Sequence, residues 1–207
     1  MKKQKSYEVA YNIAVENLRK LTFPDIIDKI KFSGCNIISN KNGIIDFSIK
    51  LFNDQYEITY PDFNFSAKNS NIVSLATKIM ILHYIEKANP YLKPTGELVS
   101  YKHIPGAFNY YPVFQKKAIL PLLEKYKTSN DLKILIEKLK ASKIEMGDFA
   151  FKIKAFPKID ITVIFWEGDE EFSSTLDFLF DSSIKDMLSL EDIVVLSQML
   201  SKRMLFV

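Results

Sequence analysis

The hydrophobic period of two between Gly43 and Tyr60 is the feature that most constrains how this chain can fold. Apolar residues alternate with polar ones over 45–51 and again over 56–60, on either side of Asn53-Asp54. Such alternation places one face of a strand against a core and the other in water. Asn and Asp tolerate the positive φ of a tight turn. The pattern therefore predicts an antiparallel hairpin with one wet face.

A second group of strands is predicted in the C-terminal half. Phe149, Phe151 and Ile153 alternate with small or charged residues, and the segment 159–166 ends in an unbroken apolar run from Val163 to Trp166. Such a run is typical of a central strand that is buried on both faces. Together with the first hairpin it predicts an α+β fold, an antiparallel sheet built from two strand pairs with helices packed mainly on one side.

Apolar residues at steps of three and four predict the helices. We expect Asn71 or Ser70 to cap a long central helix, and Ser189 to form a capping box with Asp192 before the last helix. Pro24 is expected in the first turn of a short helix. The predicted helices cover 2–21, 24–33, 72–88, a segment from Pro112 or Val113, 129–141 and 189 onward.

Length and composition bound the class of protein. The chain has 207 residues, of which 47% are hydrophobic and 26% charged, as expected for one globular domain over 1–207. Its 28 basic and 25 acidic residues are spread out, and only Arg19 and Arg203 are arginines, so we expect no nucleic-acid partner. The single cysteine, Cys35, excludes an intramolecular disulfide. No segment reads as a membrane span, so we expect a cytoplasmic protein without a membrane partner.

The segment FWEGDEEF, residues 165–172, is the first candidate site. It carries Glu167, Asp169, Glu170 and Glu171 directly after the predicted buried strand. With Asp177 and Asp181 from the following segment, these carboxylates could act as an acid/base or hard-cation site. Equally, they could form a solvated acidic turn where the strand ends. The chain has no glycine-rich phosphate loop, nucleophile elbow or HExxH motif to decide between them.

An irregular aromatic segment is the second candidate. Proline and glycine break any periodicity from Asn89 to Tyr111, which predicts a long ordered loop leading into a helix. Loops of this length inside compact domains are often functional. Tyrosines combine an apolar face with a polar tip, which suits a pocket for a flat ligand or a protein interface. The alternative is that these rings fill a small core beneath the loop.

Two segments together resemble a known family. GELVSYKHIPGAFNYYPVFQKKAILPLL (96–123) and VIFWEGDEEFSSTLDFLFDSSIKDMLSLEDIVVL (163–196) are similar to domain of unknown function 3786, an uncharacterised family found mainly in anaerobic bacteria and archaea. The family has no established activity, so the resemblance implies no catalytic residue. Some relatives carry a cysteine-rich iron–sulfur module, which implies work near redox or corrinoid chemistry. This chain lacks those cysteines, so any cluster would belong to a partner.

These features lead us to expect a small-molecule or cofactor-binding accessory protein in anaerobic redox or corrinoid-related metabolism. One alternative is an enzyme that uses the carboxylates as an acid/base or hard-metal site. Another is a protein-interaction module that docks an iron–sulfur partner. The cofactor, any catalytic residue and the oligomeric state stay unknown, and no metal ligand is assigned. The candidate ligand-binding residues are Tyr110, Tyr111, Phe114, Lys117, Trp166, Asp169, Asp181 and Ser182.

Overall fold

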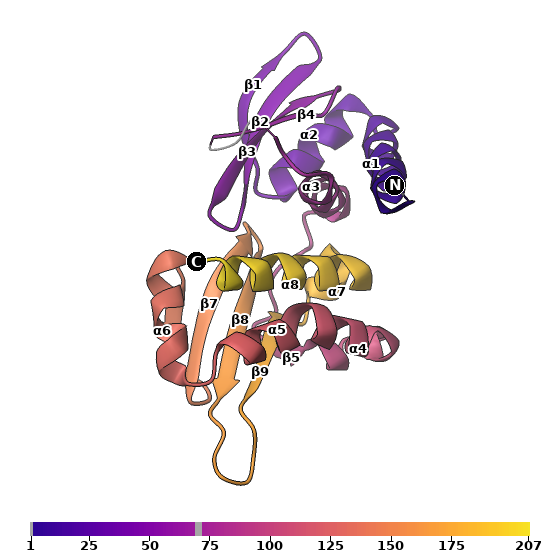
Figure 1. Ribbon diagram of the computed structural model, residues 1–207. Coiled ribbons are helices and arrows are strands. Elements are labelled where there is room, and N and C mark those ends of the chain that lie inside the picture. Colours follow the sequence, from indigo (N-terminus) through magenta and orange to yellow (C-terminus); the bar gives the residue numbers. More distant parts are fainter. Residues whose placement is uncertain (1, 69–71) are drawn as a thin grey trace. The chain divides into compact units, whose positions relative to one another are not determined.

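The computed structural model describes residues 2–68 and 72–207, and its contacts divide the chain into two compact units (Figure 1). Unit 1 comprises the residues up to Leu92 together with Phe156–Lys158, and unit 2 comprises Lys93–Ala155 and Ile159–Val207. Both contain helices and an antiparallel sheet, so the predicted α+β class is confirmed. The two predicted strand pairs lie in separate sheets, of four and five strands. That 1–207 forms a single domain stays a prediction.

The sheet of unit 1 contains the first predicted hairpin. Its four strands follow in chain order, and β2 pairs with β3 from Ile45 opposite Tyr60 to Leu51 opposite Asp54. The hairpin is confirmed, but the predicted turn residues are wrong by one position. Phe52 takes the positive φ, at 54°, because burying its ring outweighs the strain of a left-handed backbone. The strands are β1 (Asn36–Lys41), β2 (Ile44–Leu51), β3 (Asp54–Tyr60) and β4 (Asn64–Ala67).

Strand β1 was not predicted, although its turn carries a strong signal. Asn42 and Gly43 have φ of 53° and 78°, and Lys41 pairs with Ile44 across them. Positive φ at both central residues is the geometry that Asn-Gly favours in two-residue hairpins. A bulge between Ile37 and Ser39 interrupts the register of β1 and breaks its alternation. The broken alternation explains why the period of two did not reveal this strand.

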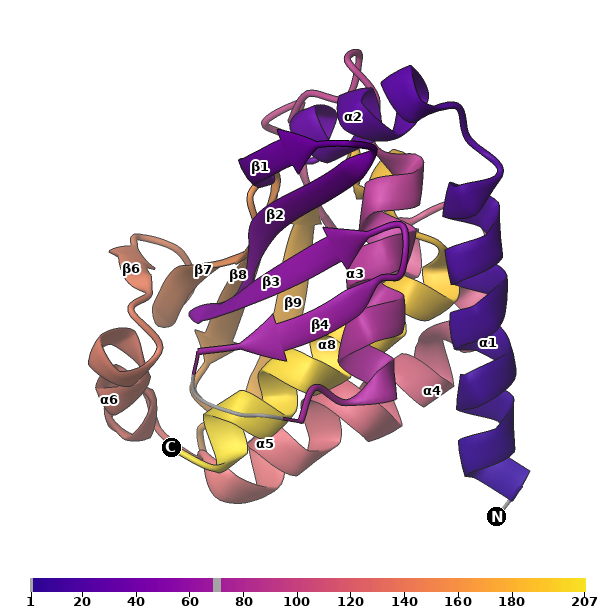
Figure 2. The ribbon, with the colours of Figure 1, turned by 90° about the horizontal axis from the view of Figure 1, so that it is seen from above.

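Three helices cover one face of the unit 1 sheet (Figures 1 and 2). Ile26 and Ile30 of the second helix and Phe47 of β2 are fully buried. Ser74 caps the third helix by accepting the Thr77 N–H at 3.2 Å; the predicted caps, Asn71 and Ser70, lie outside the described residues. The helices are α1 (Lys2–Arg19), α2 (Phe23–Phe32, with Pro24 in its first turn as predicted) and α3 (Leu75–Lys87).

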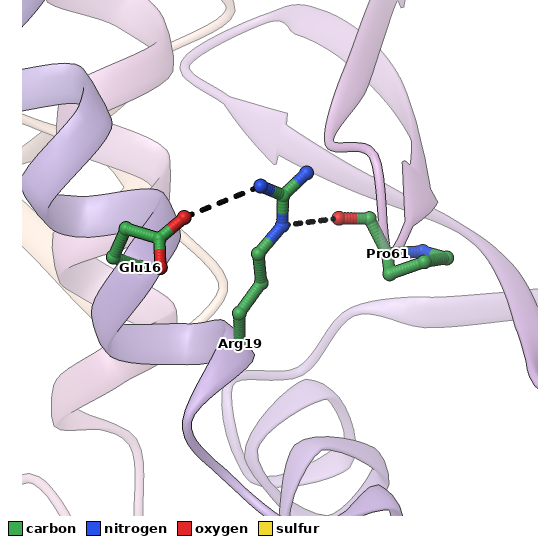
Figure 3. Close-up of polar contacts among 3 residues, drawn as sticks. All are labelled: Glu16, Arg19 and Pro61. Atoms are coloured by element: carbon green, nitrogen blue, oxygen red, sulfur yellow. Dashed lines mark hydrogen bonds and ion pairs between the residues drawn. The ribbon is translucent and has the colours of Figure 1, made fainter.

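Arg19 fastens the end of α1 to the turn that follows β3 (Figure 3). Its Nε donates to the Pro61 carbonyl at 3.0 Å, and its Nη1 lies 3.3 Å from Glu16 Oε1. The Arg19 and Glu16 side chains are 41% and 59% exposed, so their ion pair adds little stability by itself. The bond to the carbonyl is the part of this arrangement that joins two separate elements.

The sheet of unit 2 has the order β5-β9-β8-β7-β6. Every residue of β8 from Ile161 to Phe165 is buried, which confirms the prediction of a central strand, whereas Trp166 at its end is 41% exposed. Strand β9 was not predicted as a strand. The strands are β5 (Leu98–Ser100), β6 (Ser142–Ile144), β7 (Phe149–Phe156), β8 (Ile159–Trp166) and β9 (Thr175–Asp181).

Short helices replace much of the predicted loop before Tyr111. From Ala107 to Lys125 a 3₁₀ turn, an α turn, a π turn and an α-helix follow without a break, and this run packs against β9. The predicted Ser189–Asp192 capping box is confirmed. The helical elements of unit 2 are η1 (Tyr101–His103), η2 (Ala107–Tyr110), α4 (Tyr111–Phe114), η3 (Gln115–Ile119), α5 (Leu120–Lys125), α6 (Ser129–Lys138), α7 (Ile184–Met187) and α8 (Leu190–Leu205).

No helix in the described ranges is both long enough and apolar enough to cross a bilayer. The helical run from Ala107 to Lys125 turns part of its surface toward solvent, with Phe108 and Leu120 exposed, but its Lys residues and its buried core face make it an amphipathic surface element.

We expect Gly34→Ala to destabilise the protein more than Gly43→Ala. Both glycines have φ near +80°, so each substitution carries a backbone cost of about 1 kcal/mol. A Cβ at Gly34 would also lie 2.7 Å from Pro157 Cβ, whereas nothing lies within 4 Å of a Cβ at Gly43. The clash should add roughly 1–3 kcal/mol. Urea unfolding of both variants measures the difference, and equal losses would show that Pro157 moves aside freely.

Candidate functional site

The structure divides the predicted ligand-binding residues among three places in unit 2. Trp166 and Asp169 lie at the turn between β8 and β9, where Trp166 pairs with Thr175. Asp181 and Ser182 lie at the other end of β9. At about 3.3 Å per residue, the strand places Asp181 roughly 20 Å from Thr175. The remaining residues belong to the helical run: Tyr110, Tyr111, Phe114 and Lys117.

The carboxylates of the β8–β9 turn bind backbone groups of the turn and its surroundings. Asp169 Oδ1 accepts the N–H groups of Glu171 at 2.9 Å and Phe172 at 2.8 Å. The Phe172 N–H bond, followed by that of Glu171, holds the pKa of Asp169 below its usual value. Glu167 Oε1 accepts the Ser129 N–H at 2.5 Å, at the start of α6. These bonds are those of a turn stabilised by its own side chains.

Side chains that could hold a metal do not converge in the parts of the chain described by the structure. Within residues 2–68 and 72–207, no group of three or more His, Cys, Asp or Glu side chains has a metal-binding arrangement. Hard cations favour several oxygens around one point. Glu170 and Glu171 are exposed. The geometry of the acidic segment therefore favours the solvated-turn interpretation.

Asp181 ties the end of β9 to the segment before β5. Its Oδ1 accepts the Thr95 N–H at 2.9 Å and the Ser183 hydroxyl at 2.5 Å, and its Oδ2 accepts the Gly96 N–H at 2.7 Å. Ser182 joins the same network through a 2.7 Å hydroxyl contact with Thr95. Burial opposes ionisation, but the Ser183 hydroxyl and then the backbone N–H groups lower the pKa of Asp181 to about 2. This carboxylate is already saturated with donors.

The aromatic residues of the helical run have different environments. Phe114 is fully buried; its ring stacks on Tyr101 with centroids 4.5 Å apart and meets Phe178 edge-on at 6.3 Å. It is a core residue, and we leave it out of the proposed site. Tyr110 is half exposed, close enough to Tyr101 to affect the pKa of that phenol. Lys117 is exposed. Of the predicted set, Tyr111 is the residue whose pKa responds to a charged group of the sheet.

That group is Asp177, in the middle of β9. Leu176, Phe178 and Phe180 of this strand are buried on one face, and Asp177 projects half-buried on the other. Within the described residues, the hydrogen bond that reaches its carboxylate comes from the adjacent Phe178 N–H, at 2.8 Å to Oδ1. Burial raises the pKa of Asp177, although Lys102 and His103 partly offset this. The second carboxylate oxygen is left available as an acceptor.

Tyr111 and its neighbours complete a polar cluster around Asp177. Burial, and then the Asp177 charge, raise the pKa of the Tyr111 phenol. Gln115 Nε2 donates to the Tyr111 oxygen at 3.0 Å, which leaves the phenol proton free to be donated. His103 Nδ1 lies 3.0 Å from Ser100 Oγ, so the imidazole is held at the edge of the cluster. The Tyr111 phenol is thus close enough to the Asp177 carboxylate for its pKa to respond to that charge.

A π turn begins at Gln115, directly after the helical turn that carries Tyr111. The Leu120 N–H bonds to the Gln115 carbonyl, a spacing of five residues, directly before Pro121. A proline ring clashes with the carbonyl four residues earlier, here Lys117, and widening the helix relieves that clash. Such turns occur frequently at functional sites. Asp177 was predicted only as one member of the acid/base or hard-cation group of carboxylates. The usable signal in the sequence was a charged residue inside the otherwise apolar run from Leu176 to Phe180.

We expect Asp181→Asn to reduce the free energy of unfolding at neutral pH by about 1 kcal/mol, a value that allows for solvent screening. The folded-state pKa is about 2 and the unfolded value about 3.9. The contribution of the carboxylate is therefore fully present above about pH 5 and is lost as the pH falls toward 2. Urea unfolding from about pH 7 to about pH 3 should show a gap from wild type that narrows below about pH 4. Exposed Glu170→Gln is the control; a gap that does not change with pH would contradict this account.

Comparison with known proteins identifies a family to which no activity has been assigned. A family model described as Domain of unknown function (DUF3786) matches residues 25–203, which includes all of the Asp177 cluster. No curated protein and no solved structure matches the chain. The association with anaerobes stays a prediction. Because the match covers most of the sequence, the chain belongs to the DUF3786 family.

Proposed function

We propose that the protein binds a small polar ligand at the cluster of Asp177, Tyr111, Gln115, His103 and Ser100. The observation that carries this proposal is the half-buried Asp177 carboxylate, which receives one local hydrogen bond and lies near a phenol whose proton is free. A buried carboxylate without donors is costly, and such groups concentrate at functional sites. Asp181, by contrast, accepts hydrogen bonds from Thr95, Gly96 and Ser183.

The donors and acceptors of the cluster define the chemical class of the ligand. The free Asp177 oxygen accepts a hydrogen bond, and the Tyr111 hydroxyl donates one. A ligand group that both donates and accepts, a carboxamide or a hydroxyl, matches this pair. An anionic carboxylate would be repelled by Asp177 and is the poorest match. Support for a haem, corrinoid or flavin is weaker, because the cluster offers two hydrogen-bonding groups rather than an extended apolar slot.

The cellular setting belongs to the same proposal. We propose a role as a cytoplasmic accessory protein in anaerobic redox or corrinoid-related metabolism. Two observations support this role: the resemblance of residues 96–123 and 163–196 to the DUF3786 family, and the single cysteine. Burial raises the pKa of the Cys35 thiol to about 12, so this thiol is poorly suited to redox chemistry or metal ligation. Any redox centre would therefore come from a partner protein.

Acid/base catalysis is the second candidate function, and the raised pKa of Asp177 favours it. A carboxyl group with a raised pKa is better placed to exchange protons near neutral pH. Tyr111 would then hydrogen-bond the reacting group and Gln115 would orient Tyr111. Turnover of a compound that binds to the cluster, abolished by Asp177→Asn with binding retained, would distinguish this function from binding alone.

Binding can be measured by ¹H–¹⁵N NMR with a panel of small primary amides, alcohols, amines and carboxylates. We expect at least one amide or alcohol to shift the resonances of residues in the cluster. Asp177→Asn should weaken their binding about tenfold and Tyr111→Phe about fivefold, since each loses one hydrogen bond. Affinity should also fall as the pH falls through the raised pKa of Asp177, because a protonated carboxyl offers a poorer acceptor.

The matched control is Asp160→Asn, which removes a carboxylate of the same sheet that is ion-paired to Lys154 at 2.7 Å. Asp177→Asn should also unfold at a higher temperature than wild type at neutral pH, because a raised carboxyl pKa means that folding disfavours the charge. That gain shows that the variant is folded. Equal weakening by Asp160→Asn, or the lack of any amide or alcohol that binds, would contradict the proposal.

A further inference from the structure

One stretch of unit 2 contains no acidic residue. Between Glu97 and Glu124 the sequence has no Asp or Glu, although the chain has 25 of them. The same stretch contains three lysines and a histidine: Lys102, His103, Lys116 and Lys117. Its local charge is therefore positive, whereas the charges of the whole chain nearly balance.

The helical run within this stretch exposes apolar side chains. From Ala107 onward it buries one side in the core, with Phe114 and Leu122 fully inaccessible. The opposite side carries large apolar groups, of which Phe108 is 80% exposed, Tyr110 50%, Leu120 48% and Val113 42%. Lys116 and Lys117 are exposed between Val113 and Leu120. Soluble surfaces seldom gather large apolar groups in this way unless they meet a partner.

The combination of lysine, exposed aromatic rings and missing acids indicates the kind of partner. Buried centres of protein interfaces are depleted in lysine. At a membrane surface, by contrast, lysines attract anionic headgroups, and Phe, Tyr and Leu enter the headgroup boundary. We propose that residues 107–120 form a peripheral contact with an anionic lipid surface. No membrane partner was expected from the sequence because only segments that could cross the bilayer were considered. The contact proposed here lies at the membrane surface and does not cross the bilayer.

The contact is reversible and depends on salt. Two lysines, Lys116 and Lys117, and a few partly inserted side chains supply much less binding energy than a lipid anchor, so the bound fraction should be modest at millimolar lipid. Because the attraction is electrostatic, raising the salt concentration from about 0.1 M to about 0.5 M shortens the screening length and should release most of the protein. The side chains proposed to meet the lipid are Phe108, Tyr110, Val113, Lys116, Lys117 and Leu120. None of them belongs to the Asp177 cluster, so variants at these positions test the contact separately from the proposed ligand.

Co-sedimentation of the full chain with vesicles tests the proposal. We expect binding to vesicles of about three parts phosphatidylserine to seven parts phosphatidylcholine, and several-fold less to phosphatidylcholine alone. Lys116→Glu combined with Lys117→Glu should lower the bound fraction at least fivefold, and Phe108→Ser at least twofold. Circular dichroism melting should show that these surface variants fold as the wild type does.

Two matched controls distinguish binding through residues 107–120 from nonspecific binding of the protein to vesicles. Lys133→Glu combined with Lys138→Glu makes the same charge change on exposed positions of α6, and Phe172→Ser removes a ring that is 70% exposed in the β8–β9 turn. Both controls should bind as the wild type does. Equal losses in the controls, or no preference for phosphatidylserine, would overturn the proposal. Saturable binding of polyglutamate without any binding to the phosphatidylserine vesicles would also overturn it and would assign the surface to an acidic protein.

Discussion

The burial of the Phe114 ring is the interaction on which the arrangement of unit 2 depends. The ring stacks on Tyr101 and meets Phe178 and Phe180 edge-on, with centroids at 6.3 and 6.5 Å, so it joins η1, the helical run and β9 in one contact. Each aromatic contact of this kind stabilises the fold by roughly 0.5–1.5 kcal/mol more than the burial of its apolar surface alone. Once the Phe114 side chain is buried in the core, the helical geometry sets the direction in which the neighbouring side chains of the run project.

Two different surfaces follow from that single anchor. Tyr111, three residues before Phe114, is placed where the Asp177 charge affects its pKa, whereas Val113 and Lys117 are directed to solvent. Gln115 lies four residues after Tyr111, so ordinary helical spacing lets its side chain reach the Tyr111 hydroxyl. The polar cluster and the exposed apolar-basic surface are thus produced by the same packed helix, and a substitution at Phe114 would disturb both.

Sequence patterns predicted the parts of this fold in which one local rule dominates. The alternation over 45–51 and 56–60 gave the β2–β3 hairpin, the apolar run gave β8, and Ser189 with Asp192 gave the start of α8. Strand β1 was missed because a bulge breaks its period. The short helices before Tyr111 were predicted as a loop, because the search looked for apolar residues with the α-helical period of 3.6. The 3₁₀ turns, interrupted by proline and glycine, do not show that period. The division into two sheets depends on long-range pairing, which local periodicity does not encode.

The candidate site was harder to predict, and the three aspartates of the C-terminal hairpin show why. Asp169 and Asp181 stood out in the sequence because each begins or ends a polar segment, and in the structure each is satisfied by nearby backbone N–H groups. Asp177 stood out less, because it lies between buried leucine and phenylalanine in a strand that was not recognised. A carboxylate beside a turn finds several donors among the free N–H groups of that turn, whereas most N–H groups around one in a strand are used by the sheet. Asp177 receives the N–H of Phe178. An acidic residue in the middle of an apolar alternation is therefore the stronger indicator of a site, since the fold gives it the fewest partners.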